Sequence, residues 1–203
     1  MKPSVLVDID GVLADCQGPL YAELHKRGYM LLPERNDFYE ATSAQLQEIY
    51  NLTQPEAHDL LAEIWFAPQF IEQQPVRLDA IGAMRWILGL AEQVHIVTAR
   101  TSLGRPDVPV VTQNWLNRYG FTYHKLVFER EKHVYAKEHG IHYVIEDNPS
   151  IAERCWMRGI GVFLVDHTYN RMVSPRERLW RVKSMAEIPK LMQKDWSAQQ
   201  KGA

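Results

Sequence analysis

The sequence predicts an α/β protein, with a Rossmann-like three-layer core around a parallel sheet and a small helical cap inserted after the first strand. Two observations predict the core. Short runs rich in Val, Ile or Phe recur along the chain, and several are apolar at successive positions, as strands buried on both faces are. Amphipathic segments of helical length separate these runs, an alternation that favours right-handed crossovers and a parallel sheet. A long stretch without a convincing strand, which follows the first strand, predicts the cap.

The core elements follow from these patterns in chain order. The expected strands are Val5–Ile9, Val94–Thr98, Lys125–Phe128, Tyr143–Glu146 and Val162–Val165. The expected core helices are Asp79–Ala91, Val110–Tyr119, His133–His139 and Pro149–Arg158. The last helix follows Asp147-Asn148, so a capping side chain precedes a proline in the first turn, as is typical of a helix start.

Residues 18–75 interrupt the alternation. Helix-like segments occur at Pro19–Arg27, Ser43–Asn51 and Pro55–Trp65, and the proline-containing run Phe66–Val76 is interpreted as a return linker. We therefore expect a core of residues 1–17 and 76–194, a helical cap of residues 18–75 and a flexible tail of residues 195–203.

Composition narrows the functional classes. The 203 residues are 46% hydrophobic and 24% charged, with a net charge of -2, which argues against a broad polyanion-binding surface. Cys16 and Cys155 are the two cysteines, too few for a disulfide framework, and they favour a reducing compartment. We identify no leader-like segment, and the longest apolar stretch, residues 81–91, is too short to span a bilayer. The expectation is a cytoplasmic protein with no membrane partner; the oligomeric state is not predicted.

The most informative pattern lies at the end of the first strand. Asp8 and Asp10 follow the apolar run Val5–Val7, and Gly11 then breaks the strand. Side chains two apart on a strand point the same way, so the two carboxylates converge and repel unless a cation or a shared proton relieves them. Open α/β sheets bind their ligands at this edge. A surface Asp-x-Asp-Gly turn is the alternative, but the buried strand before it favours a functional site.

Two later strands also end in residues that could bind phosphate or a metal ion. Thr98 closes the second strand ahead of Ala99 and Arg100, and a hydroxyl with adjacent backbone N–H groups can hold phosphate oxygens. Glu146 and Asp147 end the fourth strand at the same edge, although Asp147 alone would pass for a helix cap. Several carboxylates at one edge suit Mg²⁺. Lys132, between a strand and a helix, is placed to balance the charge of a bound phosphate.

Taken together, these motifs resemble a known superfamily. The sequence matches the four motifs of the haloacid-dehalogenase-like phosphohydrolases in order and spacing, through Asp8-Ile9-Asp10-Gly11-Val12, Thr98, Lys132 and Glu146-Asp147. The wording Asp-Ile-Asp-Gly-Val-Leu-Ala-Asp and a cap between the first two motifs are similar to the 5′(3′)-deoxyribonucleotidase group. Two departures are Thr-Ala-Arg, which also occurs in phosphatases acting on polynucleotide 3′ ends, and Glu146 where Asp is usual.

The resemblance implies a mechanism. Asp8 would be the nucleophile that forms an aspartyl-phosphate, and Asp10 the general acid and base. Mg²⁺ would be held by Asp8, the backbone carbonyl of Asp10 and Asp147, with Glu146 acting through water. The phosphoryl-binding residues implied are Thr98, the amide of Ala99 and Lys132.

Substrate recognition is less well determined by the residues. Arg100 is expected to contact substrate, with a salt bridge as the alternative. The aromatic residues Trp65, Phe66 and Phe70 are expected to pack within the cap rather than to stack on a base. Residues 166–170 follow the fifth strand and are a candidate part of the pocket rim.

The predicted function is hydrolysis of a small phosphomonoester. We expect a Mg²⁺-dependent phosphomonoesterase acting on a nucleoside monophosphate. The alternatives are a polynucleotide 3′-phosphatase, a small-metabolite phosphatase and a catalytically idle sensor of phosphorylated ligands.

Overall fold

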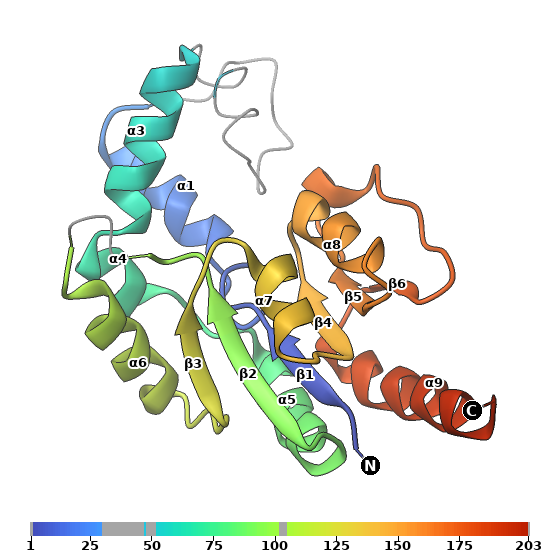
Figure 1. The fold of residues 1–203 in the computed structure, drawn as a ribbon. Coiled ribbons are helices and arrows are strands. Elements are labelled where there is room, and N and C mark those ends of the chain that lie inside the picture. Colours follow the sequence, from blue (N-terminus) through green and yellow to red (C-terminus); the bar gives the residue numbers. More distant parts are fainter. Residues whose placement is uncertain (1, 30–46, 48–51, 102–104, 203) are drawn as a thin grey trace.

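The core of the protein is a parallel sheet flanked by helices (Figure 1). The computed structural model describes residues 2–29, 47, 52–101 and 105–202. Within these residues the sheet has six strands in the order β3-β2-β1-β4-β5-β6, every neighbouring pair being parallel. The strands are β1 (Ser4–Val7), β2 (Gln93–Thr98), β3 (Lys125–Phe128), β4 (Tyr143–Glu146), β5 (Gly161–Val165) and β6 (Leu179–Val182). The predicted α/β fold class is confirmed, and β6 is an addition to it.

Alternating strand residues bury the two faces of the sheet under separate helices. Val5 and Val7 of β1 pack into a core with helices α5 (Leu78–Leu90), α6 (Val108–Arg118) and α9 (Ile188–Gly202). Leu6 points to the other face, where α7 (Lys132–Glu138) and α8 (Pro149–Trp156) contribute to a second core. The period of two along a buried strand thus produces three layers.

The register of β1 sets the place of the acids. Val7 lies opposite Ile96 of β2 on one side and Ile145 of β4 on the other. The Asp8 N–H then donates to the Ile145 carbonyl at 3.0 Å, so Asp8 is the first residue beyond the strand. Because the strands are parallel, Thr98 and Glu146 end at the same edge.

Helices α1 (Gln17–Lys26), α3 (Gln54–Trp65) and α4 (Pro68–Gln73) occupy the segment between β1 and α5. They share a small apolar core, which includes Leu20, Leu24, Ile64 and Phe70. In Figure 1, α1 and α3 stand beyond the carboxyl ends of the strands. Thr53 caps α3 in a reciprocal capping box with Glu56.

One segment of the cap differs from the sequence-based expectation, and most of another lies outside the described residues. The run interpreted as a return linker contains the helix α4, which begins at Pro68, a favourable first-turn residue. Of the expected helix Ser43–Asn51, only Gln47 is described, and it is helical. The boundaries of the core and cap stay a prediction.

Residues 195–202, expected to form a flexible tail, belong to a helix. Helix α9 runs to Gly202, and Asp195 accepts a hydrogen bond of 2.7 Å from the Tyr143 hydroxyl. Trp196 packs edge-on against His142 at 4.8 Å between ring centroids. These tertiary contacts, rather than helix propensity, hold a polar segment in place. No helix in the described ranges has the length and apolar character needed to cross a bilayer.

Candidate active site

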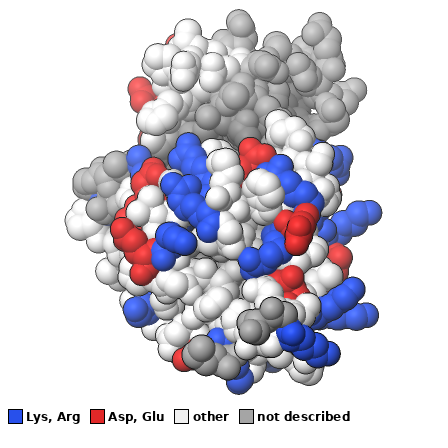
Figure 2. Space-filling model, turned by 45° about the vertical axis from the view of Figure 1, so that its right-hand side comes forward, with Lys and Arg blue, Asp and Glu red and all other residues white. Residues whose placement is uncertain are grey.

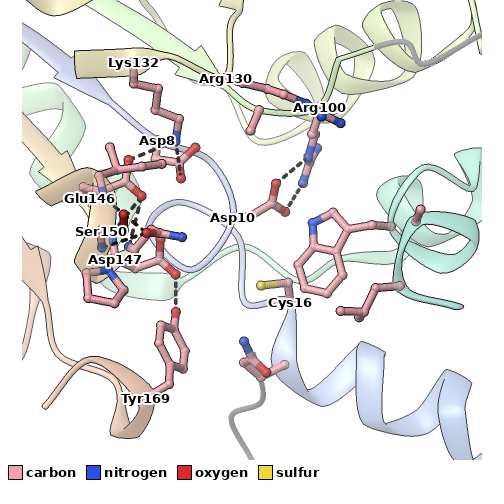
Figure 3. Close-up of a pocket in the computed structure, with 18 of the residues that line it drawn as sticks. Asp8, Asp10, Cys16, Arg100, Arg130, Lys132, Glu146, Asp147, Ser150 and Tyr169 are labelled. Atoms are coloured by element: carbon pink, nitrogen blue, oxygen red, sulfur yellow. Dashed lines mark hydrogen bonds and ion pairs between the residues drawn. The ribbon is translucent and has the colours of Figure 1, made fainter. Parts of the chain in front are cut away.

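A cavity of about 640 Å³ lies at the carboxyl edge of the sheet, between the strand ends and helices α1 and α3. Figure 3 shows acidic and basic side chains converging on it from separate elements. The predicted site residues that line it are Asp8, Asp10, Ala99, Arg100, Lys132, Glu146 and Asp147. Thr98 lies just beneath, fully buried at the end of β2, where its Oγ1 accepts a 3.3 Å hydrogen bond from the Arg100 N–H.

The turn after β1 presents Asp8 and Asp10 to the cavity. The Ile9 carbonyl accepts hydrogen bonds from the N–H groups of Val12, Leu13 and Ala14, so the chain folds back at once. Gly11 has a φ of 74°, and a Cβ at this position would overlap the Asp147 carboxylate. A residue with no side chain is therefore required for the first and fourth strand ends to approach each other.

Three carboxylates cluster around one point of the cavity. Asp8, Glu146 and Asp147 each offer an oxygen atom, and these atoms all lie within 4.8 Å of one another. Burial, followed by the negative charge of Glu146, raises the pKa of Asp8 well above its usual value. Burial likewise raises the pKa of Glu146 and of Asp147. A set of crowded oxygen ligands fits a hard divalent cation, whose charge would reverse these shifts.

Lys132 bridges two of these acids. Its Nζ lies 2.6 Å from Asp8 Oδ2 and 2.9 Å from Glu146 Oε2, and its side chain is 1% exposed. Burial on its own would lower the pKa of Lys132, but the two carboxylates raise it, so the ammonium group is retained. The other oxygen of Glu146, Oε1, accepts from the N–H groups of Asp147 and Asn148. Both carboxylate oxygens of Glu146 are thus engaged by protein groups.

Asp10 has a different set of partners. Arg100 donates from Nε to Oδ2 at 2.9 Å and from Nη2 to Oδ1 at 2.7 Å. Gln74 Nε2 donates to Oδ1 at 3.3 Å, and the Trp65 indole N–H also donates to this carboxylate. Burial opposes ionisation of Asp10, yet the charge and hydrogen bonds of Arg100 outweigh it, and the pKa of Asp10 is lowered. In this state the Arg100 guanidinium is paired with Asp10; its predicted contact with substrate stays a prediction.

The sequence analysis missed several residues of the site. Gln74, fully buried between α4 and α5, donates to Asp10 and accepts from Arg100. Tyr169 donates to Asp147; its segment was expected only as part of the rim, and the sequence signal was its place after β5. Arg130 and Arg154 line the same cavity. No local sequence pattern could have identified Gln74, because its contacts depend on the path that the chain takes after α4.

Apolar side chains also line the cavity. Leu61, Ala62, Trp65 and Phe66 line it from the end of α3. The Trp65 ring also packs on Phe70 at 5.6 Å between centroids, so the expected packing within the cap is present beside a face open to the cavity. The site therefore combines charged side chains with an apolar, partly aromatic lining.

Comparison with known proteins assigns the family. A family model described as "5′ nucleotidase, deoxy (Pyrimidine), cytosolic type C protein" matches residues 2–198. The chain belongs to this family. It is therefore a phosphoric monoester hydrolase of the haloacid-dehalogenase-like superfamily, as its motifs implied. No curated protein matches the chain.

Solved structures share the fold of this family member at low sequence identity. A haloacid-dehalogenase-like family hydrolase from Xanthomonas campestris is 16% identical with a TM-score of 0.56, covering 95% of each chain. A superfamily hydrolase of subfamily IA from Geobacter sulfurreducens is 15% identical with a TM-score of 0.57, covering 94% of this chain and 96% of that chain. These likenesses establish the fold and carry no information about the substrate.

Proposed function

We propose that this hydrolase is a Mg²⁺-dependent phosphomonoesterase that cleaves nucleoside monophosphates through an aspartyl-phosphate on Asp8. The observation that carries the proposal is a cavity whose lining is both charged and apolar. Asp8 and Asp10 line it together with the apolar side chains of Leu61, Trp65 and Phe66. A volume of about 640 Å³ is within the range of small-ligand sites. A phosphate would bind beside Asp8, and a base would pack against the apolar side chains.

The first step is attack by an Asp8 carboxylate oxygen on phosphorus. A new P–O bond to Asp8 forms as the ester P–O bond breaks, and the leaving oxygen takes a proton from Asp10. In the second step Asp10 accepts a proton from the water that attacks phosphorus, and phosphate leaves with Asp8 regenerated. Arriving substrate would compete with Asp10 for Arg100, because both are anionic. This competition would release Asp10 from the ion pair that lowers its pKa.

The remaining residues neutralise and position charge. Lys132 is within reach of Asp8 and would pair with the transferred phosphoryl group. Ala99 lines the cavity beside Arg100, where its amide would hold a phosphoryl oxygen, with Thr98 supporting the turn. Asp8, Asp147 and the Asp10 backbone carbonyl would hold Mg²⁺, with Glu146 acting through water. When bound, the ion would offset the negative charge of the acids and polarise the phosphoryl group.

A panel of substrates tests the proposal. Purified protein with Mg²⁺ is assayed for phosphate release from ribo- and deoxynucleoside 5′- and 3′-monophosphates, sugar phosphates and 3′-phosphorylated oligonucleotides. We expect the highest kcat/KM for a nucleoside monophosphate. Greater turnover of sugar phosphates would contradict the assignment, and no turnover of any compound would favour a sensor that binds phosphorylated ligands.

The chemistry is tested separately from the substrate. Asp8→Asn should abolish turnover while the circular dichroism spectrum is unchanged, and excess chelator should remove the activity of the unmodified protein. Retained turnover in Asp8→Asn would exclude Asp8 as nucleophile. Full rates in chelator would exclude the metal.

A specific observation favours a second candidate, a phosphatase for polynucleotide 3′ ends. Arg130 and Arg154 line the cavity; Arg130 has no carboxylate partner within the described residues, and Arg154 lies 3.9 Å from Glu131. Such cations would suit the next phosphate of a strand. Against it, Figure 2 shows basic side chains interspersed with acidic ones on the face it presents. The oligonucleotide arm of the panel decides between the two.

A further inference from the structure

We propose that Tyr169 is a positioning residue for the divalent-cation site, which it serves by orienting the Asp147 carboxylate. The inference rests on the cation site of the proposed function and adds a residue that the motifs of the superfamily resemblance do not include. Tyr169 lies in η1 (Thr168–Asn170), the short helix that follows β5. Its hydroxyl donates to Asp147 Oδ2, and Figure 3 shows the ring below Asp147 with its hydroxyl pointing at the carboxylate.

Asp147 is held from two directions by the same short helix. While Tyr169 bonds its side chain, Asn170 Nδ2 donates to its backbone carbonyl at 2.8 Å. On another side Gly11 approaches so closely that any Cβ there would overlap the carboxylate. One oxygen of Asp147 is therefore confined between a phenol and a glycine, which determines the orientation of the carboxylate.

The helix η1 is itself anchored, so that Tyr169 has little freedom. The His167 ring stacks on the Tyr169 ring, with 5.1 Å between the ring centroids and 8° between the ring planes. His167 Nε2 also donates a hydrogen bond of 2.8 Å to the Gly11 carbonyl. Arg181 of β6 donates to the side chain of Asn170 at 2.6 Å and to its carbonyl at 2.9 Å. These contacts link the hydroxyl to the sheet and to the turn that carries Asp8.

Tyr169 differs in charge from the basic side chains that hold the other acids. Asp8 and Glu146 share the ammonium group of Lys132, and Asp10 pairs with the guanidinium of Arg100. The Tyr169 hydroxyl that donates to Asp147 is a neutral phenol, and the His167 ring stacked on it also lowers the pKa of Asp147. A neutral donor fixes the direction of the carboxylate without cancelling its charge, which suits a group that must coordinate a cation.

Direction matters here because the neighbouring acids repel Asp147. Oxygen atoms of Asp8, Glu146 and Asp147 lie within 4.8 Å of one another, so their like charges repel, and without a restraint the Asp147 side chain would rotate away before a cation arrives. By holding one oxygen, Tyr169 keeps the carboxylate beside Asp8 in the absence of metal. The cation then meets ligands that are already arranged.

The test measures metal affinity directly. Tyr169→Phe retains the ring and its stacking and removes only the hydroxyl. Isothermal titration calorimetry of metal-free protein with MgCl₂, and with MnCl₂ as a second probe, gives the dissociation constant. We expect affinity to fall about 10- to 100-fold, the usual effect of losing a partner that orients a metal ligand. Tyr135→Phe is the matched control, because its phenol bonds His95 at 3.0 Å outside the cavity.

A second measurement separates positioning from general damage. In the Mg²⁺ dependence of turnover, Tyr169→Phe should need about 10- to 100-fold more Mg²⁺ for half-maximal rate, while the rate at saturating Mg²⁺ approaches that of the unmodified protein. A merely structural role would lower the maximum instead. Titrations at 10 °C keep the variant folded even if its thermal midpoint is reduced.

The outcomes are distinguishable. An unchanged dissociation constant for Tyr169→Phe, or an equal loss in Tyr135→Phe, overturns the inference. Asp147→Asn serves as the reference for a damaged site. If Asp147→Asn binds Mg²⁺ as tightly as the unmodified protein, the cation site of the proposed function fails, and the role of Tyr169 fails with it. If Asp147→Asn is weakened and Tyr169→Phe is not, only the role of Tyr169 is overturned.

Discussion

Arg100 binds Asp10 in a bidentate manner, donating hydrogen bonds from Nε to Oδ2 at 2.9 Å and from Nη2 to Oδ1 at 2.7 Å. The guanidinium is 1% exposed, and Gln74 accepts from it as well as donating to Asp10. Before substrate binds, this arrangement holds the proposed acid and base at one position beside Asp8. It also means that the planar fork of an arginine, rather than positive charge alone, holds that position.

We therefore expect Arg100→Lys to lower kcat/KM about 10- to 100-fold, although the charge is kept. The loss corresponds to a hydrogen bond to a charged group, worth about 1.5–3 kcal/mol. Steady-state kinetics on the best substrate of the panel measure it, with Arg85→Lys on the exposed side of α5 as the control. Wild-type kinetics in Arg100→Lys would show that the bidentate geometry is not needed.

Replacing Lys132 by methionine should destabilise the protein at neutral pH. The change leaves Asp8 and Glu146 buried without their shared cation, which typically costs about 3–5 kcal/mol. Because burial already raises the pKa of both acids, they take up protons as the pH falls, and the difference from the unmodified protein should narrow toward acid. Urea unfolding of metal-free protein at several pH values measures this.

Lys137→Met, at an exposed position of α7, is the control for the Lys132 variant. It should change the free energy of unfolding little at any pH. A loss in Lys132→Met that is as small as in this control would mean that the two acids find other compensation.

Gly11→Ala should impair catalysis more than its backbone strain explains. Gly11 and Gly120 both have positive φ, 74° and 69°, so alanine at either costs about 1–2 kcal/mol of backbone strain. A Cβ at Gly120 meets open space, whereas one at Gly11 overlaps the Asp147 carboxylate. Thermal unfolding and kcat, measured on both variants, separate the two effects. Equal retention of activity would contradict the close approach of Gly11 to Asp147.

His95 should make stability depend on pH. It is 3% exposed on β2, its Nδ1 contacts the Tyr135 hydroxyl, and burial, then the charge of Lys125, lowers its pKa from 6.5 to about 4. Between pH 6.5 and about 4, His95 is protonated in the unfolded chain and neutral in the folded protein. The contribution of His95 is therefore complete above pH 6.5 and lost as the pH falls to about 4, at most about 3 kcal/mol.

A comparison with His95→Gln isolates this effect from other titrating groups. The free energy of unfolding of the unmodified protein should fall more steeply between pH 6.5 and 4 than that of the variant. His25→Gln, exposed on α1, should follow the unmodified protein. Parallel curves for all three proteins would mean that His95 titrates normally in the folded state.

The sequence-based prediction was most successful where one strand end decides the chemistry. Asp8, Lys132 and Asp147 could be assigned to one edge of the sheet, because the carboxyl ends of parallel strands lie together regardless of loop conformation. The edge strand β6 was missed because Trp180 and Arg181 are only partly buried and its run is short. The last helix was missed for a similar reason, since its residues are polar and are held by Tyr143 and His142 from the sheet.

The order of residues alone determined which chemical groups this protein carries and which edge of the sheet they reach, because local periodicity specifies strands and parallel strands share an edge. Tertiary structure alone decided which groups are paired. Arg100 meets Asp10 rather than solvent, Gln74 enters the site from the end of α4, and Tyr169 bonds Asp147. Each contact joins segments more than twenty residues apart, and its geometry depends on how whole elements pack, which no local pattern in the sequence records.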